Sequence, residues 1–135
     1  MDISKEDIPN EFNNSDYGIL MFVLSAVVPE YHETILIKVY NAMNKGGVLY
    51  FRDYARYDMN QVRFSKKGKN KIDNNLYIRH DKTLAYYFDK EEFEELAIKV
   101  GFKIIESKLI TRVFENRKDN KVMHRLWLQI KLKKI

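Results

Sequence analysis

The stretch "YGILMFVLSAVVP", Tyr17 to Pro29, is a nearly unbroken apolar run that follows the polar "NEFNNSD". It is too short to cross a bilayer. Its first part, Ile19 to Leu24, predicts a strand buried on both faces, because such strands are typical of parallel sheets that helices cover on each side. The run therefore predicts an α/β fold.

The residues after this run predict a helix and then a second strand. The helix would extend from about residue 30 to residue 44, since apolar residues recur at helical spacing on one side: Ile35, Leu36, Val39 and Met43. The "KGG" of Lys45 to Gly47 would end the helix with a basic charge and a glycine. "VLYF", Val48 to Phe51, predicts a second buried strand. Short connections between these elements predict a right-handed crossover and therefore two parallel strands.

A second helix is predicted after residue 88 from its start and stop signals. Asp89 is a suitable N-cap with Glu92 three residues later, and Phe88 and Phe93 flank the cap as a hydrophobic staple. Gly101 would end the helix. Four residues form its apolar stripe: Phe93, Leu96, Ala97 and Val100.

Two further strands are predicted at the end of the chain. The first would cover Phe102 to Phe114, and the second Val122 to Leu132, with the polar turn "ENRKDNK" between them. Apolar and polar residues alternate along the last strand, which predicts an antiparallel strand with one exposed face. Between the two halves, residues 53–87 predict an irregular polar excursion. A loop of that length inside a compact domain is usually functional or disordered.

Composition excludes several kinds of site. The chain has 135 residues, 45% of them hydrophobic and 32% charged, which suits one compact domain. It has no cysteine, which excludes disulfides, thiolate catalysis and cysteine-ligated zinc. His32, His80 and His124 lack metal-ligand spacing, so we expect no metal site and take each as a surface or loop residue. With no apolar run of bilayer length and an acidic N-terminus, we expect a soluble intracellular protein.

The charge distribution favours an anionic partner. The formal net charge is +5, and basic residues gather in "RFSKKGKNK", Arg63 to Lys71, and in the tail Lys131 to Lys134. A solvated flexible loop explains the first cluster equally well.

The segments that follow the two predicted parallel strands carry the chemistry. "LSAVVP" follows the first strand and "RDYARYD" follows the second, and ligands of open α/β sheets bind at that edge. The alternative is a turn whose ions pair with one another. Farther along, "NLYIRHDKTLAYYF" again mixes arginine, aspartate and tyrosine. Arginine binds phosphate, tyrosine stacks on bases and carboxylates accept from amines, which suits an extruded nucleotide. Core tyrosines with stabilising ion pairs remain an equal alternative.

Five segments carry a family resemblance. "MFVLSAVVP", "YFRDYARYDMNQVRF", "NLYIRHDKTLAYYFDKEEFEEL", "VGFK" and "RLWLQIK" occur in this order and resemble the methyltransferase-like tRNA 3-methylcytidine methyltransferases. The resemblance extends from about Tyr17 to Lys133. It implies a class I, Rossmann-like, seven-stranded methyltransferase fold, of which this chain is the C-terminal half. Residues 1–135 would form one partial domain with strands 4, 5, 6 and 7, the last two an antiparallel hairpin, in the family's spatial strand order 3-2-1-4-5-7-6. Residues 53–87 would form an irregular substrate-side insertion.

The resemblance also implies an activity and its residues. The enzyme would transfer a methyl group from S-adenosylmethionine to N3 of a flipped cytidine in the anticodon loop of tRNA. N3 already carries an in-plane lone pair, so positioning matters more than base catalysis, and a carboxylate would stabilise the cationic product. The implied catalytic residues are Asp53, Arg52 and Tyr54. The cofactor would contact Met21, Phe22, Leu24 and Ser25, and RNA would contact Tyr57, Arg63, Arg79, Asp81, Thr83, Tyr86 and Arg125.

The chain departs from the family pattern in two ways. Leu84 stands where such sequences usually carry an arginine. The glycine-rich turn that holds the cofactor is absent, and "NKGGV", Asn44 to Val48, cannot replace it because it joins a helix end to a strand. We therefore expect weak or no cofactor binding by this chain alone. We also expect residues 19–24 to form an open sheet edge, which would pair with the remaining half or with a second copy.

Alternative functions stay open. The chain could be a non-catalytic RNA-binding or scaffold fragment, or a methyltransferase-like protein that acts on another substrate. A cytoplasmic location is expected, with the nucleus as the alternative, and the need for a helper protein is left open.

Overall fold

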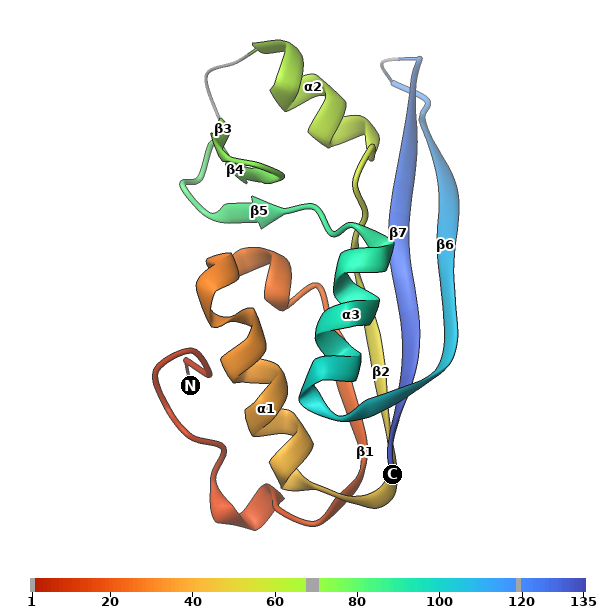
Figure 1. The fold of residues 1–135 in the computed structure, drawn as a ribbon. Helices are drawn as coiled ribbons and strands as arrows, with labels where there is room; N and C mark the ends of the chain where they lie inside the picture. The colour runs from red at the N-terminus through yellow and green to blue at the C-terminus, as the bar shows by residue number, and fades with distance from the viewer. Residues whose placement is uncertain (1, 68–70, 119) are drawn as a thin grey trace.

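The main sheet contains four strands in the order β1-β2-β7-β6 (Figure 1). The computed structural model describes residues 2–67, 71–118 and 120–135, with the side chains of residues 64–67 left out. β1 and β2 are parallel, and the other two neighbouring pairs are antiparallel. The elements are β1 (Ser15–Met21), α1 (His32–Ala42), β2 (Met43–Tyr54), α2 (Met59–Lys67), β3 (Lys71–Asp73), β4 (Leu76–Ile78), β5 (Leu84–Tyr86), α3 (Lys90–Val100), β6 (Phe102–Asn116) and β7 (Lys121–Lys134).

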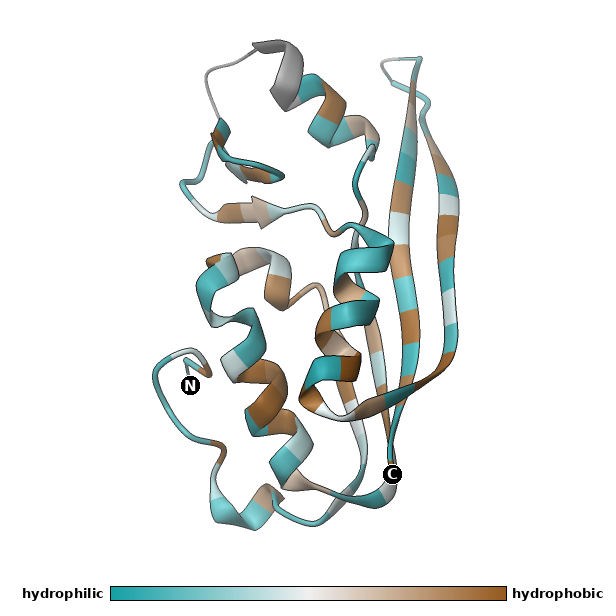
Figure 2. Cartoon of the chain, in the orientation of Figure 1, coloured by the Kyte–Doolittle hydropathy of each residue, from teal (hydrophilic) through white to brown (hydrophobic). Residues whose placement is uncertain are grey.

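This strand order is the one expected for strands 4, 5, 7 and 6 of the class I methyltransferase fold. The parallel pairing of β1 with β2 and the antiparallel β6–β7 hairpin are both confirmed. Hydrophobic and hydrophilic residues alternate along β6 and β7, as Figure 2 shows. In β7 the side chains of Leu128, Ile130 and Leu132 are buried, while Gln129 and Lys131 between them are only half-buried. The pattern that predicted the last strand therefore also predicted its buried face.

Helices α1 and α3 lie on the same side of the sheet (Figure 1). Lys99 of α3 donates to Glu33 of α1 at 3.2 Å, which places the two helices side by side. The prediction that the first strand is buried on both faces is therefore wrong for the residues described. Leu20 is buried, whereas Ile19 is 67% exposed, because no described helix packs on the other face of β1.

The end of α1 lies two residues earlier than predicted, and β2 is longer. The helix stops at Ala42, and Met43 to Gly47, predicted as helix end and turn, belong to β2. The physical reason is a contact from the far end of the chain. Nζ of Lys134 donates to the carbonyl oxygens of Tyr40 at 2.9 Å and Met43 at 2.8 Å. A lysine on β7 thus satisfies carbonyl groups for which the sequence suggested Lys45.

Helix α3 follows its sequence signals. Asp89 accepts a hydrogen bond from the backbone N–H of Glu92 at 3.1 Å, and the rings of Phe88 and Phe93 lie 5.5 Å apart. Gly101 ends the helix with φ = +126°. The predicted N-cap, staple and stop are confirmed.

Residues 53–87 are more regular than predicted. They contain α2 and a second sheet with the order β3-β4-β5, placed beyond the carboxyl ends of β1 and β2 (Figure 1). A small core stabilises this sheet, made of Tyr77, Ala85 and Tyr87 with Tyr54 packed against it. The prediction of an irregular excursion is therefore wrong in structure. These residues lie at the carboxyl ends of β1 and β2, as expected, and substrate binding there stays a prediction.

Candidate functional site

The carboxyl ends of β1 and β2 are joined by backbone and side-chain hydrogen bonds. The N–H of Phe22 donates to the carbonyl oxygen of Arg52 at 2.8 Å. One carboxylate oxygen of Asp53 accepts from the N–H of Ser25 at 3.0 Å, and the other accepts from the N–H of Tyr54 at 2.8 Å. The two parallel strands therefore bring Ser25 and Asp53 together, as the sequence predicted.

Asp53 is fully buried, and this determines what its carboxylate can do. Burial raises the pKa of Asp53 to about 6, although hydrogen bonds from Ser25 and Tyr54 favour the charged form. Arg79 lies close enough to oppose the rise as well. In this arrangement Asp53 fixes the loop after β1 and does not face solvent.

His32 holds the same loop from the other side. Its Nε2 lies 2.8 Å from the carbonyl oxygen of Leu24 and 2.9 Å from that of Val27, so this nitrogen must carry a proton and donate to both. Burial lowers the pKa of His32. The sequence interpretation of His32 as a surface or loop residue is wrong, because it is the first residue of α1 and its side chain is buried.

The four residues assigned to the cofactor differ in their surroundings. Met21 is 49% exposed and Phe22 is half-buried, so both offer surface at the end of β1. Leu24 is fully buried in the main core, and the N–H of the buried Ser25 already donates to Asp53. Only Met21 and Phe22 are thus placed to touch a ligand with their side chains. Two of the four residues therefore suit contact with S-adenosylmethionine, whereas the side chains of Leu24 and Ser25 are buried.

Arg52 and Tyr54 lie on the face of β2 opposite Asp53, because side chains alternate along a strand. Nε of Arg52 donates to Gln129 at 2.9 Å, and its guanidinium carbon lies 5.7 Å from the centre of the Trp127 ring. The implied catalytic triplet is therefore divided between the two faces. Arg52 does not contact Asp53 in any interaction described for these residues.

The ring of Tyr54 connects the end of β1 with two arginines. Its centre lies 5.1 Å from the ring centre of Phe22. The guanidinium carbons of Arg79 and Arg125 lie 5.1 Å and 5.2 Å from the same ring, within the range of cation–π attraction. Tyr54 thus contacts Phe22 at the end of β1, Arg79 of the excursion and Arg125 of β7.

An open cavity of about 440 Å³ lies at these arginines, and we name it the Tyr54 cavity. Asp81 stands on its wall and accepts from the hydroxyl of Thr83 at 2.6 Å, and this hydrogen bond lowers the pKa of Asp81. The wall therefore offers fixed cations, one carboxylate and an aromatic ring. Six residues line it: Tyr54, Asn60, Arg79, His80, Asp81 and Arg125.

The residues assigned to RNA are divided by the structure. Arg79, Asp81 and Arg125 line the Tyr54 cavity, and Thr83 supports Asp81. Tyr57 and Tyr86 instead line a second cavity beside α2, and Arg63 is exposed on α2 without lining either one. The resemblance implied one group of residues, and the fold divides it between the two cavities and the exposed surface of α2.

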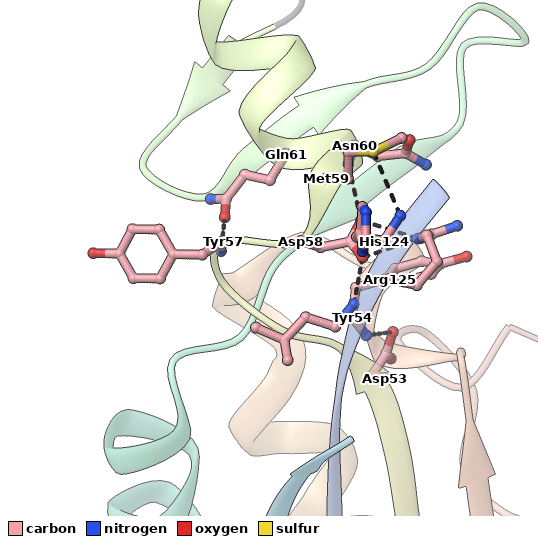
Figure 3. Close-up of polar contacts among 10 residues, drawn as sticks. Asp53, Tyr54, Tyr57, Asp58, Met59, Asn60, Gln61, His124 and Arg125 are labelled. Carbon is pink, nitrogen blue, oxygen red and sulfur yellow. Dashed lines mark hydrogen bonds and ion pairs between the residues drawn. The ribbon is translucent and has the colours of Figure 1, made fainter. Parts of the chain in front are cut away.

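Sequence reasoning missed Asp58, which is fully buried at the start of α2. Its carboxylate accepts from Nε of Arg125 at 2.9 Å, from the N–H of Leu126 at 2.7 Å and from the N–H of Asn60 at 3.1 Å (Figure 3). The signal that could have found it is Asp58 with Gln61 three residues later, a helix-start pattern. Because Asp58 holds Arg125, it also shapes the Tyr54 cavity.

Two absences concern the part of the chain that the structure describes. Its His, Asp and Glu residues form no group of three or more that could hold a metal ion. In the same residues no helix has the length and apolar character needed to cross a membrane.

Comparison with curated proteins finds relatives along nearly the whole chain. "O-methyltransferase 3" of Dictyostelium discoideum is 42% identical over 98% of the chain, which covers 31% of that protein. The tRNA N(3)-methylcytidine methyltransferase Mettl2 of Drosophila melanogaster is 39% identical over 94% of the chain and 38% of its own length. The chain spans about a third of the length of these relatives. No family model matches it.

Comparison with solved structures shows the fold. A SAM-dependent methyltransferase from Methanosarcina mazei matches all of this chain and 65% of its own, with a TM-score of 0.70 and 17% sequence identity. The 1,6-didemethyltoxoflavin-N1-methyltransferase of Burkholderia thailandensis, solved with S-adenosylhomocysteine, matches 98% of this chain and 48% of its own, with a TM-score of 0.60. The described chain therefore has part of the class I methyltransferase fold.

Proposed function

We propose that this chain, which is similar over nearly its whole length to tRNA N3-cytidine methyltransferases, forms the substrate-side part of such an enzyme. It would act in methyl transfer from S-adenosylmethionine to N3 of a cytidine in a tRNA anticodon loop. The observation that carries this proposal is the Tyr54 cavity. It joins two guanidinium groups, an aromatic ring and a carboxylate at the edge where ligands of α/β sheets bind.

The chemistry of that cavity suits an unpaired nucleotide. The guanidinium of Arg79 is half-buried beside Tyr54 and would bind a phosphate oxygen. Asp81 and the amide of Asn60 can exchange hydrogen bonds with the edge of a base. The S-adenosylmethionine that we infer would supply an electrophilic methyl group, and Met21 and Phe22 are the described residues that would hold it.

The roles of the chain's own residues follow from their contacts. N3 of cytosine has a lone pair and needs no base to remove a proton, so orientation and exclusion of water are the main requirements. Asp53 and His32 fix the loop Leu24 to Val27 at the end of β1. We propose that Asp53 acts by positioning this loop, because its carboxylate is buried and both of its oxygens accept backbone N–H groups.

The RNA part of the proposal is tested by binding measurements on the whole chain. We expect Arg79→Ala to weaken binding of an anticodon stem-loop about tenfold and to reduce the salt dependence by about one phosphate contact. The control is Lys103→Ala, which removes an equal charge from an exposed site at the other end of the sheet. Equal effects of the two substitutions would show that only overall charge matters and would refute the proposed site.

A second candidate function is methylation of an oxygen. The observation in its favour is the 42% identity to a protein named O-methyltransferase 3. An oxygen nucleophile would require removal of a proton, whereas N3 of cytosine would not. Mass spectrometry of tRNA nucleosides from cells with and without the gene separates the two. Loss of 3-methylcytidine supports the first candidate, and its persistence with loss of an O-methylated product supports the second.

β1 has both an unpaired edge in the described sheet and an exposed apolar face, which suggests that another chain segment covers it. β1 lies at the edge of the described sheet, and Tyr17, Ile19 and Met21 are 70%, 67% and 49% exposed on one face. We propose that this edge pairs with further strands of the same enzyme or with a second copy. Light scattering of the chain would show association, which Ile19→Lys should weaken. A stable monomer with slow amide exchange in β1 would refute this.

We propose the following organisation for the chain. The chain would form one partial methyltransferase domain, and residues 53–87 would face the substrate. A cytoplasmic location is proposed, with the nucleus as the alternative, and a helper protein for tRNA binding stays an open part of the proposal.

A further inference from the structure

A second cavity among the described residues is separate from the Tyr54 cavity. It has a volume of about 660 Å³ and lies between the start of α2, the turn from β3 to β4 and the start of α3. We name it the Tyr57 cavity. It shares no lining residue with the Tyr54 cavity. In Figure 3 the ring of Tyr57, which lines this cavity, points away from Arg125, which lines the Tyr54 cavity.

Tyr57 is held in an unusual conformation at the rim of this cavity. Its φ is +75°, a left-handed value that costs free energy for a residue with a bulky side chain. The N–H of Tyr57 donates to Oε1 of Gln61 (Figure 3). Nε2 of Gln61 donates in turn to the side-chain oxygen of Asn75 at 2.9 Å. Gln61 is only 6% exposed. This chain of hydrogen bonds holds the backbone of Tyr57, whose side chain is 70% exposed.

The walls of the cavity combine aromatic, cationic and acidic groups. The guanidinium carbon of Arg56 lies 5.1 Å from the centre of the Tyr57 ring, and Lys71 adds a second cation. Tyr86 and Glu92 form part of the lining as well. Burial and the nearby carboxylate of Glu92 raise the pKa of Tyr86, so its hydroxyl remains a donor.

This set of groups matches one nucleotide. A base can stack on the exposed face of Tyr57, since every base has an aromatic face. Arg56 and Lys71 can bind the attached phosphate. Glu92 can accept from an exocyclic amine, which adenine and cytosine have and uracil lacks. The volume lies within the range of ligand sites.

We propose that the Tyr57 cavity binds a single nucleotide of unpaired RNA with an amino-bearing base, separate from the nucleotide in the Tyr54 cavity. This inference rests on the proposed function, because it assigns a neighbouring nucleotide of the same substrate. Tyr57 supplies the stacking surface, Arg56 and Lys71 bind phosphate, and Glu92 selects the amine. Gln61 is a positioning residue that acts through the backbone of Tyr57.

The test is titration of the whole chain with AMP, CMP, UMP and ribose 5-phosphate, followed by amide NMR. We expect saturable shifts at Tyr57, Gln61 and Asn75 with AMP and CMP, and weaker binding of UMP. Tyr57→Ala should weaken AMP binding at least fivefold, whereas Tyr57→Phe should retain it. Glu92→Ala should remove the preference for AMP over UMP. The control is Tyr17→Ala, because Tyr17 is also 70% exposed but lies on β1, away from the cavity.

Several outcomes would overturn the inference. Ribose 5-phosphate that binds as well as AMP would show that the base is not recognised, and unchanged binding in Tyr57→Ala would exclude stacking. An unpaired hexanucleotide that binds no more tightly than AMP would overturn the assignment to RNA. These results are independent of Arg79→Ala, which tests the proposed function. Failure of one proposal is therefore distinguishable from failure of the other.

Discussion

Asp58 and Arg125, 67 residues apart in the sequence, form a partly buried ion pair that joins the start of α2 to β7. Nε of Arg125 lies 2.9 Å from Oδ1 of Asp58, whose side chain is fully buried. The same carboxylate accepts the N–H groups of Leu126 and Asn60. One side chain thus positions an arginine of the Tyr54 cavity and the helix beside it.

We expect Asp58→Ala to lower the free energy of unfolding by about 2–4 kcal/mol, because the partly exposed guanidinium of Arg125 and the N–H groups of Leu126 and Asn60 lose their acceptor. Chemical denaturation measures this. The control is Glu33→Ala, which removes the exposed pair with Lys99 and should cost about 1 kcal/mol or less. If the two variants lost equal stability, the Asp58 pair would have no special structural role.

A second prediction concerns the buried carboxylate of Asp53 and pH. Its folded-state pKa of about 6 lies above the ordinary value of 3.8, so the folded chain binds more protons than the unfolded chain between these values. This group therefore destabilises the fold as pH rises through that window, by roughly 3 kcal/mol in total. Above about pH 6 the contribution is constant.

The measurement is the difference in unfolding free energy between the wild type and Asp53→Asn across pH 4 to 7.5. His32, whose pKa is lowered, favours the fold as pH rises, and the subtraction removes its contribution because both proteins retain it. We expect the difference to change between about pH 4 and 6 and to be level above that. A difference that does not vary with pH would contradict the raised pKa of Asp53.

A third prediction compares two glycines with positive φ. Gly101 has φ = +126°, and a Cβ there would lie 3.0 to 3.1 Å from the ring of Tyr40. Gly46 has φ = +84° with nothing within 4 Å of that position. Gly46→Ala should cost about 1 kcal/mol from backbone strain alone, whereas Gly101→Ala should cost about 1–3 kcal/mol more. Thermal unfolding of the two variants compares them, and equal losses would refute the steric contribution of Tyr40.

A fourth prediction concerns the end of α1. Lys134→Met keeps the length of the side chain and removes the donor that satisfies the carbonyl oxygens of Tyr40 and Met43. We expect a loss of about 1–2 kcal/mol in unfolding free energy. Lys133→Met, at the exposed neighbouring position, should change stability by less than about 0.5 kcal/mol. Hydrogen exchange at the end of α1 should become faster only in Lys134→Met.

The sequence predicted the main sheet well because the signals involved are local. Apolar runs and alternation gave the four strands, and the family resemblance gave their order. It predicted residues 53–87 poorly. The short strands β3, β4 and β5 are each three residues long, too short for periodicity to show, and their pairing depends on the core formed by Tyr77, Ala85 and Tyr87.

The candidate site was predicted by residue type but not by arrangement. The meeting of Asp53 with Ser25 follows from two parallel strands that end at one edge. Nothing in the sequence showed that the carboxylate of Asp53 would be fully buried, or that Arg52 would bind Gln129 on the opposite face. Burial and facing partners arise from packing between distant segments, which one sequence does not display.

The two long helices of the fold show where this limit lies. By itself the sequence determined both ends of α3, since Asp89 and Gly101 act within a few residues of the backbone that they cap. Only the tertiary structure decided the end of α1, because Lys134 reaches it from β7, more than ninety residues away. A cap made within one turn is encoded locally, whereas a cap made across the sheet exists only after the strands have paired.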